Sequence, residues 1–397
     1  MWRHIRYRRT MPIYHRLGRI PPKRHMVFAE AGALFPEQLI GNEGFSGLSS
    51  LLYHRRRPTP MVSITQIKDL TRERDPQRVF APRHFQTAPL PSVASAIADR
   101  VPLLFNDDVA ISYVHATKAD DFFYRNGQAD EVIFVVEGEG VLESLMGELP
   151  YRKGDYVVIP RGILHRYRFT SASTRFLVIE SGGSIRTPKH YRNAFGQLTE
   201  IAPFCERDIR RPDSLISHDQ TGDYRLVVKQ DERLFEVMTD HHPLDVIGWD
   251  GYYYPWAFNI RDFEPRVGRL HLPPTVHQTF ESDGFVICSF CPRLYDFDPL
   301  AIPAPYHHLN VRSDEVLFYV EGEFMSRKGI SSGSITLHPD GLAHGPQPGR
   351  TEASIGKTRT DEYAVMVDTF RPLRVARQAT ALEDPLYYRS WLEGNGK

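Results

Sequence analysis

Short apolar runs alternate with Gly, Pro and Asp turns over most of the chain, which is the pattern of antiparallel β-hairpins. Between about residues 101 and 182 the runs are VIFVVEGEGVLESL, ELPYRKGDYVVIPRG and RYRFTSASTRFLVIES. A second β-rich block extends from about residue 256 to residue 370. Helical periodicity is scarce, and we expect only a short helical tail around LEDPLYYRSWLEG. The pattern predicts a mainly β fold of sandwich or barrel type.

Two segments of the chain nearly repeat each other, DEVIFVVEGE at residues 130–139 and DEVLFYVEGE at residues 314–323. The same spaced pattern follows each copy, namely Gly154, Pro160, Gly162 and His165 after the first and Gly333, Pro339, Gly341 and His344 after the second. Internal repeats decide architecture, so we expect two similar small β-barrels. The predicted divisions are an arm at 1–100, a first barrel with connector at 101–235, and a second barrel with tail at 236–397.

The first hundred residues differ in composition from the two β-rich blocks. They are rich in Arg and Pro and contain only short apolar patches. We expect an extended arm with a few strands that wraps the body or a neighbouring subunit. The opening MWRHIRYRRT has no apolar core and is not a secretory signal. Whether the native chain begins at Met1 or at Met11 stays open.

The charge and cysteine content exclude several classes of function. Lys+Arg and Asp+Glu are both 49, so the net charge is zero and no global basic field attracts nucleic acid or a membrane surface. The longest apolar runs are too short for a spanning helix. Three cysteines suit a reducing cytoplasm. Cys288 and Cys291 form a C-x-x-C inside GFVICSFCP, where a packed strand is favoured over a zinc or redox site.

The second repeat carries the side chains of a metal centre. Alternate residues of a strand face the same side, so His308, Asn310 and Glu315 can point into one barrel interior, and His344 completes the set. Two imidazoles and one carboxylate form the facial triad of non-heme Fe(II) oxygenases, although Mn(II) or Ni(II) would fit nearly as well. His307 competes with His308 for this role, because only one of two neighbouring residues should point inward. The spacing to Glu315 favours His308.

The first repeat keeps only part of this set. Glu131 and His165 are present, but Tyr124 and Asn126 stand at the positions of His308 and Asn310. One imidazole and one carboxylate make a poor transition-metal site. We therefore expect the first barrel to be structural, with Glu131 and His165 hydrogen-bonded to each other or to water.

These residues resemble the cupin superfamily, and more narrowly the homogentisate 1,2-dioxygenase family. The similarity extends from about residue 34 to residue 392. The segments that carry it, in order, are LFPEQLIGNEGFSG, SSLLYHR, DVIGWDGYYYPWAFNIRDF, PYHHLNVRSDEV, LHPDGLAHGP and PLYYRSWL.

The resemblance implies two cupin barrels and an Fe(II) enzyme that inserts both atoms of O2 into a dihydroxylated aromatic acid such as homogentisate and opens its ring. It implies a place in the catabolism of aromatic compounds such as tyrosine, and a homo-oligomer, a trimer or hexamer. The family's ligands match His308, Glu315 and His344. His338 matches a histidine close to the substrate, and Tyr306 lies in the first metal segment as a further candidate substrate contact.

Two positions depart from the family's pattern. Asp250 stands after Trp249 where the family has a substrate-facing histidine, and Phe324 stands where it has a tyrosine. Asp250 could serve as a base or be a turn residue before Gly251. One extra residue lies between His308 and Glu315, which a loop should absorb. Losing two polar substrate contacts should shift substrate preference. A barrel metalloenzyme of another chemistry (a different oxidation or an isomerisation) and a non-catalytic small-molecule-binding bicupin are the alternatives.

Overall fold

The computed structural model describes residues 13–324, 327 and 329–392. The mainly β prediction is confirmed, with 43% of residues in strands and 8% in helices. The question of a start at Met1 or Met11 falls outside the described residues. The predicted helical tail contains the 3₁₀ helix η6 (Tyr387–Trp391), and a second 3₁₀ helix, η5 (Arg377–Leu382), ends where that segment begins.

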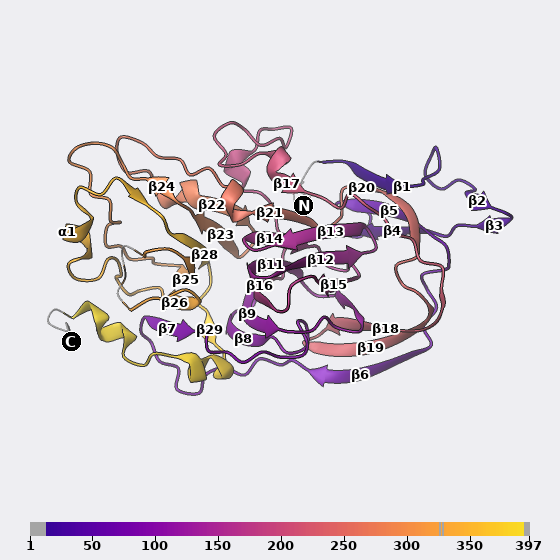
Figure 1. Cartoon of the computed structure of the whole chain (residues 1–397), viewed down its shortest axis with the longest axis horizontal. Helices are drawn as coiled ribbons and strands as arrows, with labels where there is room; N and C mark the ends of the chain where they lie inside the picture. Colours follow the sequence, from indigo (N-terminus) through magenta and orange to yellow (C-terminus); the bar gives the residue numbers. More distant parts are fainter. Residues whose placement is uncertain (1–12, 325–326, 328, 393–397) are drawn as a thin grey trace, which may run out of the picture.

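The first repeat belongs to two large sheets (Figure 1). One has the strand order β13-β12-β15-β10-β18-β19-β6 and is formed by Gly147–Arg152, Glu139–Ser144, His165–Phe169, Phe123–Asn126, Thr221–Gln230, Arg233–His241 and Ser63–Asp69. The other has the order β17-β21-β14-β11-β16-β9-β8-β29, formed by Ile209–Arg210, Trp256–Asn259, Asp155–Ile159, Asp130–Glu137, Thr174–Ser181, Val109–Ala116, Val101–Phe105 and Arg374–Val375. The predicted division after residue 235 falls inside β19.

The second repeat belongs to a six-stranded sheet of order β22-β23-β28-β25-β26-β7, formed by Gln278–Glu281, Phe285–Phe290, Tyr363–Thr369, Asp314–Glu321, Ser334–His338 and Arg83–Gln86. A two-stranded sheet, β24 (Arg293–Leu294) with β27 (Arg359–Thr360), and the short helix α1 (Arg350–Ser354) accompany it. Phe318 on β25 packs against Phe134 on β11 with ring centroids 6.3 Å apart. One continuous apolar core therefore joins the two repeats.

Strands from both ends of the chain complete the sheets. β7 precedes the first repeat but pairs with β26 of the second, and β29 follows the second repeat but pairs with β8 of the first. The remaining arm strands, β1 (His15–Gly18), β5 (Ser49–His54) and β4 (Glu37–Gly41), join β20 (Val246–Gly251) in a four-stranded sheet. A small hairpin, β2 (Ala29–Glu30) with β3 (Ala33–Leu34), projects at one end of the molecule (Figure 1).

The second repeat does not build a full counterpart of the first barrel's β10–β15 sheet. After His165 the sequence HRYRF forms the continuous strand β15, whereas after His344 the sequence is GPQPGR. Pro346 and Pro348 lack the N–H group that a strand ladder needs. His308 and His344 consequently form an isolated antiparallel bridge, not the pair of strands expected from the sequence. The two histidines therefore lie on loops beside the six-stranded sheet, whose strand β25 carries Glu315.

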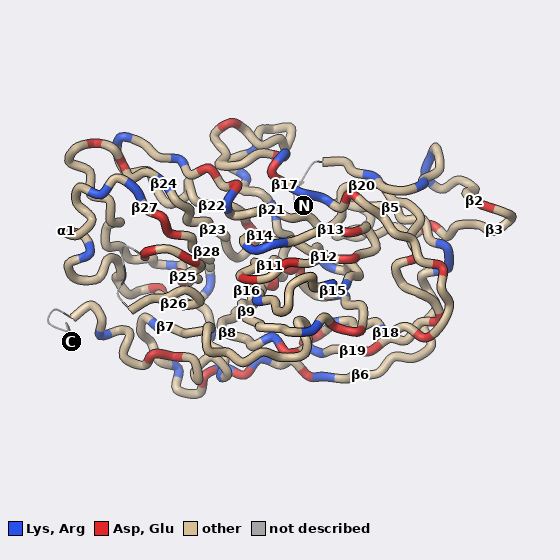
Figure 2. The backbone as a smooth tube through the Cα atoms, viewed as in Figure 1, with Lys and Arg blue, Asp and Glu red and all other residues tan. Residues whose placement is uncertain are grey.

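The remaining predictions were drawn from the charge, the cysteine content and the lengths of the apolar runs. Acidic and basic residues are interleaved over both repeats (Figure 2). Cys288 is buried on β23, in a packed strand as predicted, and Cys291 follows it with its thiol donating to the Ile260 carbonyl at 3.2 Å. Within the described part of the chain, no helix has the length and apolar character required to cross a membrane.

Candidate metal centre

The two repeats share the pairing of the residues that precede and follow the DEV segment. Tyr124 lies opposite His165 in the first repeat, and His308 lies opposite His344 in the second. The preceding Pro-x-Gly turn is also the same, because Gly162 donates its N–H to the Asn126 carbonyl at 2.8 Å and Gly341 donates to Asn310 at 3.0 Å. Both glycines have φ near +80°, at 83° and 78°. The spacing noted in the sequence is thus a real geometric repeat.

The aspartate that opens each DEV segment anchors the turn that presents the histidine. Asp314 accepts the backbone N–H of Asp340 at 2.8 Å and that of Leu373 at 2.6 Å. Asp130 accepts the N–H groups of Arg161 and Ile185 in the same way. Sequence reasoning assigned no role to this residue, although its repetition in both copies was a signal. Its carboxylate fixes the distance between the strand bearing the glutamate and the turn bearing the histidine.

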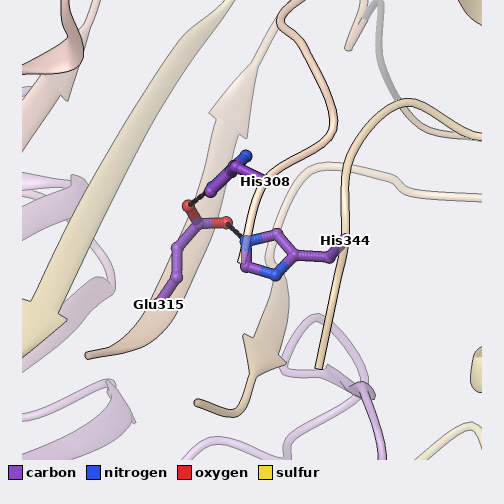
Figure 3. A group of neighbouring side chains, drawn as sticks. All are labelled: His308, Glu315 and His344. Carbon is purple, nitrogen blue, oxygen red and sulfur yellow. Dashed lines mark ion pairs between the residues drawn. The ribbon is translucent and has the colours of Figure 1, made fainter. Parts of the chain in front are cut away.

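His308, Glu315 and His344 converge in the second repeat (Figure 3). Their candidate ligand atoms all lie within 4.8 Å of one another. The Nε2 atom of His308 is 3.6 Å from Glu315 Oε2, and that of His344 is 3.5 Å from Glu315 Oε1. Glu315 and His344 are buried, whereas the His308 side chain is 32% exposed. The group therefore has a closed side and a side open to small molecules.

Backbone carbonyls orient both imidazoles. His308 Nδ1 is 3.3 Å from the Tyr306 carbonyl, and His344 Nδ1 is 3.2 Å from the Leu342 carbonyl. A carbonyl can only accept, so each Nδ1 carries the proton and each Nε2 presents a lone pair toward Glu315. Among the described residues, His344 Nε2 is buried without a hydrogen-bond partner. This tautomer is the one that a metal-ligating histidine needs.

The electrostatics keep Glu315 ionised. Burial raises the pKa of this carboxyl, but the neighbouring imidazoles of His308, His338 and His344 outweigh burial and hold it well below its usual range. The Glu315 carboxylate in turn raises the pKa of His308. An ionised carboxylate beside two imidazole lone pairs is a donor set for a divalent transition metal.

His307 lies outside this group. It is exposed, and its ring packs against the Cα of Gly345, where a Cβ would come within 2.5 Å of His307 Nδ1. His308 is the member of the pair whose nitrogen faces Glu315. The spacing argument for His308 agrees with this geometry.

In the first repeat an arginine lies beside the equivalent carboxylate. Arg100 donates to both oxygens of Glu131, at 2.9 and 3.1 Å, and Tyr124 and Asn126 donate to Oε1. His165 lies in the same buried cluster, with its Nδ1 on the Ile163 carbonyl at 3.0 Å. Its Nε2, like that of His344, has no partner among the described residues. Here the guanidinium supplies the positive charge. Arg100 has no motif that would have revealed this role in the sequence.

Comparison with known proteins finds relatives along nearly the whole chain. The family described as homogentisate 1,2-dioxygenase N-terminal matches residues 94–260. A Saccharolobus solfataricus protein named "Putative dioxygenase" is 41% identical over 384 residues, which cover 96% of this chain and 99% of that protein. The homogentisate 1,2-dioxygenase of Bradyrhizobium diazoefficiens is 28% identical over 293 residues, which cover 67% of this chain and 61% of that enzyme. The chain belongs to the homogentisate 1,2-dioxygenase family.

It is a divergent member of the homogentisate 1,2-dioxygenase family. Among solved structures, a cupin 2 conserved barrel domain protein from Leptotrichia buccalis matches with a TM-score of 0.36 and 10% identity, covering 74% of this chain and 99% of that chain. The family's relatives carry dioxygenase names, which supports an oxygenase activity for this chain.

His338, which matches a substrate-proximal histidine of the homogentisate 1,2-dioxygenase family, lies behind Glu315. It is fully buried, its Nδ1 is 2.9 Å from Glu315 Oε1, and its ring stacks on that of His344 at 4.7 Å. Burial lowers the pKa of His338 to about 4, so the imidazole is neutral at physiological pH. The structure thus brings His338 to the metal-site group, on its closed side.

Tyr306 lies beside the group, whereas Phe324 packs against β25, the strand that carries Glu315. The exposed Tyr306 ring is 6.2 Å from that of His308 and perpendicular to it. Phe324 follows β25 and meets Tyr319 edge to face at 4.6 Å. Phe324 has no hydroxyl, so it cannot supply the hydrogen bond of the tyrosine found in the homogentisate 1,2-dioxygenase family.

The structure does not bring Asp250 to this group within one chain. Asp250 lies on β20, between Arg16 on β1 and Leu51 on β5, away from the sheet that carries Glu315 (Figure 1). Its carboxylate accepts the Tyr14 hydroxyl at 3.0 Å and is 3.9 Å from Arg24. Asp250 is therefore a paired strand residue, and the alternative of a turn residue is wrong.

Proposed function

We propose that this protein is an Fe(II)-dependent dioxygenase that opens the ring of homogentisate or a related dihydroxylated aromatic acid, inserting both atoms of O2. The observation that carries the proposal is the convergence of His308, Glu315 and His344 in a chain of the homogentisate 1,2-dioxygenase family. Two imidazoles and one carboxylate that leave further positions open suit Fe(II).

The residues present fit a divalent metal. His344 Nε2 is a buried acceptor with no partner among the described residues, and a cation would satisfy it. Glu315 is ionised and points both oxygens at imidazole nitrogens. Fe(II) held there would supply positive charge for a deprotonated ring hydroxyl and the redox chemistry for O2.

The chain itself orients the ligands and shapes the approach. The Tyr306 and Leu342 carbonyls hold the two imidazole rings, so the metal-binding geometry needs little rearrangement. Next to His308, the side chains of Tyr306, Leu309 and Val311 are exposed and apolar or aromatic. Such side chains would pack against an aromatic ring as it enters. We therefore propose Tyr306 and Phe324 as substrate contacts.

The departures from the family pattern bear on the substrate. Asp250 is paired with Tyr14 and Arg24, and Phe324 lacks a hydroxyl. A site that loses a hydrogen-bonding partner loses discrimination for the matching substrate hydroxyl. These observations make a related dihydroxylated aromatic acid a second candidate substrate beside homogentisate. A homotrimer or hexamer remains a prediction.

Oxygen uptake by anaerobically Fe(II)-loaded protein tests this function. Homogentisate, gentisate, hydroquinone and catechol are compared, with product mass showing the gain of two oxygen atoms. Uptake with any one of these diols supports the ring-cleaving activity and identifies the substrate. One bound iron without uptake on any of them would refute the aromatic substrate class.

Metal content of matched variants tests the site. Glu315→Ala and His344→Ala are expected to lose the metal, whereas His165→Ala, the equivalent position in the first repeat, is expected to keep it. Equal loss from all three variants would contradict a single site in the second repeat.

A further inference from the structure

The C-terminal helix η6 packs onto the closed side of the metal-site group. The hydroxyl of Tyr387 is 3.5 Å from His338 Nε2, and the Trp391 ring meets the His338 ring edge to face at 6.1 Å. Tyr387 is buried and stacks edge-on against Trp391 at 5.2 Å. The two aromatic side chains thus enclose the face of His338 that points away from Glu315.

Polar contacts fix this helix next to the turn that carries His344. Trp391 donates its indole N–H to the Gly345 carbonyl at 3.1 Å, and Arg327 donates to the same carbonyl at 2.6 Å. Gln347 donates to the Ser390 hydroxyl at 2.6 Å. Gly345 and Gln347, which follow His344 closely, therefore help to set the position of η6.

The directions of the hydrogen bonds follow from the chemistry of the partners. A carboxylate that binds a metal can only accept, so His338 donates its Nδ1–H to Glu315 Oε1 over 2.9 Å. An imidazole whose one proton is on Nδ1 accepts at Nε2, and Nε2 faces the Tyr387 hydroxyl. Tyr387 therefore donates to His338, and His338 donates to Glu315. Each group holds the next in one orientation.

We infer that Tyr387 and His338 are positioning residues of the metal centre, forming a hydrogen-bonded chain that orients the Glu315 carboxylate. This inference rests on the proposed function. The C-terminal helix thereby becomes part of the metal centre. His338 acts by orienting Glu315, whereas the resemblance to the family implied a direct contact with the substrate. With Oε1 held by His338, the carboxylate cannot rotate freely, and Oε2 stays directed toward His308.

Metal affinity of full-length variants, measured with Co(II) by chelator competition, tests the chain. Tyr387→Phe removes only the hydroxyl, and Tyr388→Phe is the matched control, because that neighbouring ring is 44% exposed and its hydroxyl contacts Arg389. Partners that orient a ligand typically contribute 10- to 100-fold in affinity. Because the Tyr387 contact is long, we expect a loss of about 10-fold for Tyr387→Phe and none for Tyr388→Phe.

Two further variants separate positioning from packing. His338→Asn can return a donor to the place of Nδ1, whereas His338→Leu fills a similar volume without one. We expect His338→Asn to retain more Co(II) affinity than His338→Leu, and the Co(II) absorption bands to shift in Tyr387→Phe while its Tm stays near that of the wild type.

The results that would overturn the positioning role differ from those that would overturn the proposed function. A wild type that binds Co(II), with Tyr387→Phe of equal affinity and unshifted bands, would overturn the positioning role and leave the metal site standing. A wild type that binds no Co(II) would overturn both.

Discussion

Removing Arg100 should destabilise the first repeat far more than removing a comparable surface arginine. Arg100→Met keeps most of the apolar stem but leaves Glu131, which is fully buried, without its bidentate partner. Tyr124 and Asn126 would still donate to Oε1, but Oε2 would lose its partner among the described residues. The variant must then either bury an unpaired charge or protonate Glu131.

The pKa of Glu131 gives the size of the expected loss in folding free energy. Burial raises the pKa of Glu131, and the charge of Arg100 overcomes burial to bring it to about 2. The difference from the usual 4.5 corresponds to about 3 kcal/mol of folding free energy at neutral pH. Breaking a buried ion pair by removing one partner costs about 3–5 kcal/mol, which agrees. The exposed pair of Arg359 and Asp361, 62% and 67% exposed, should contribute less than about 1 kcal/mol.

Urea unfolding at pH 7, followed by tryptophan fluorescence, measures the loss for Arg100→Met and for the control Arg359→Met. The double variant Arg100→Met/Glu131→Leu should recover part of the loss, because it removes the unpaired carboxylate as well. Metal content should not change, since Arg100 contacts Glu131 of the first repeat and not the metal-site group. Equal losses for the two single variants, or no recovery in the double variant, would refute the ion-pair account.

Acid sensitivity and core packing give the remaining predictions. Burial lowers the pKa of His277 to about 3, below its unfolded value of 6.5, so the unfolded state binds the proton first and stability falls as pH drops from 6.5 toward 3. In urea titrations across this range, His277→Gln should reduce the pH slope by up to about 1.4 kcal/mol per pH unit, and an unchanged slope would contradict this. Phe280→Ala, at a fully buried ring, should cost about 3–5 kcal/mol, whereas Phe195→Ala, 80% exposed, should stay within about 0.5 kcal/mol in the same assay. Similar losses for the two phenylalanines would disprove the assigned core.

Local patterns in the sequence predicted the fold class and the members of the metal-site group. The repeated spacing is a local property of strands and turns, so it indicated His308, Glu315 and His344 without any knowledge of distant contacts. Strand alternation indicated that only one of His307 and His308 points inward, and the spacing to Glu315 favoured His308.

Contacts between distant segments could not be predicted in this way. Arg100 reaches Glu131 from outside the repeat, and Tyr387 reaches His338 from the C-terminal tail, so neither has a spacing signal. The pairing of Asp250 with Tyr14 depends on where the arm lies, which composition does not determine. The loss of a strand after His344 did have a local signal in Pro346 and Pro348.

The strands β7 and β29 have a consequence for where this chain could be shortened. Each lies at the outer edge of the repeat from which it is more distant along the chain, so a truncation before residue 101 or after residue 369 would remove an edge strand from the repeat at the other end of the chain. An uncovered sheet edge invites aggregation. The segment before the first repeat is therefore part of the metal-binding sheet, and the segment after the second repeat is part of the sheet that carries Glu131.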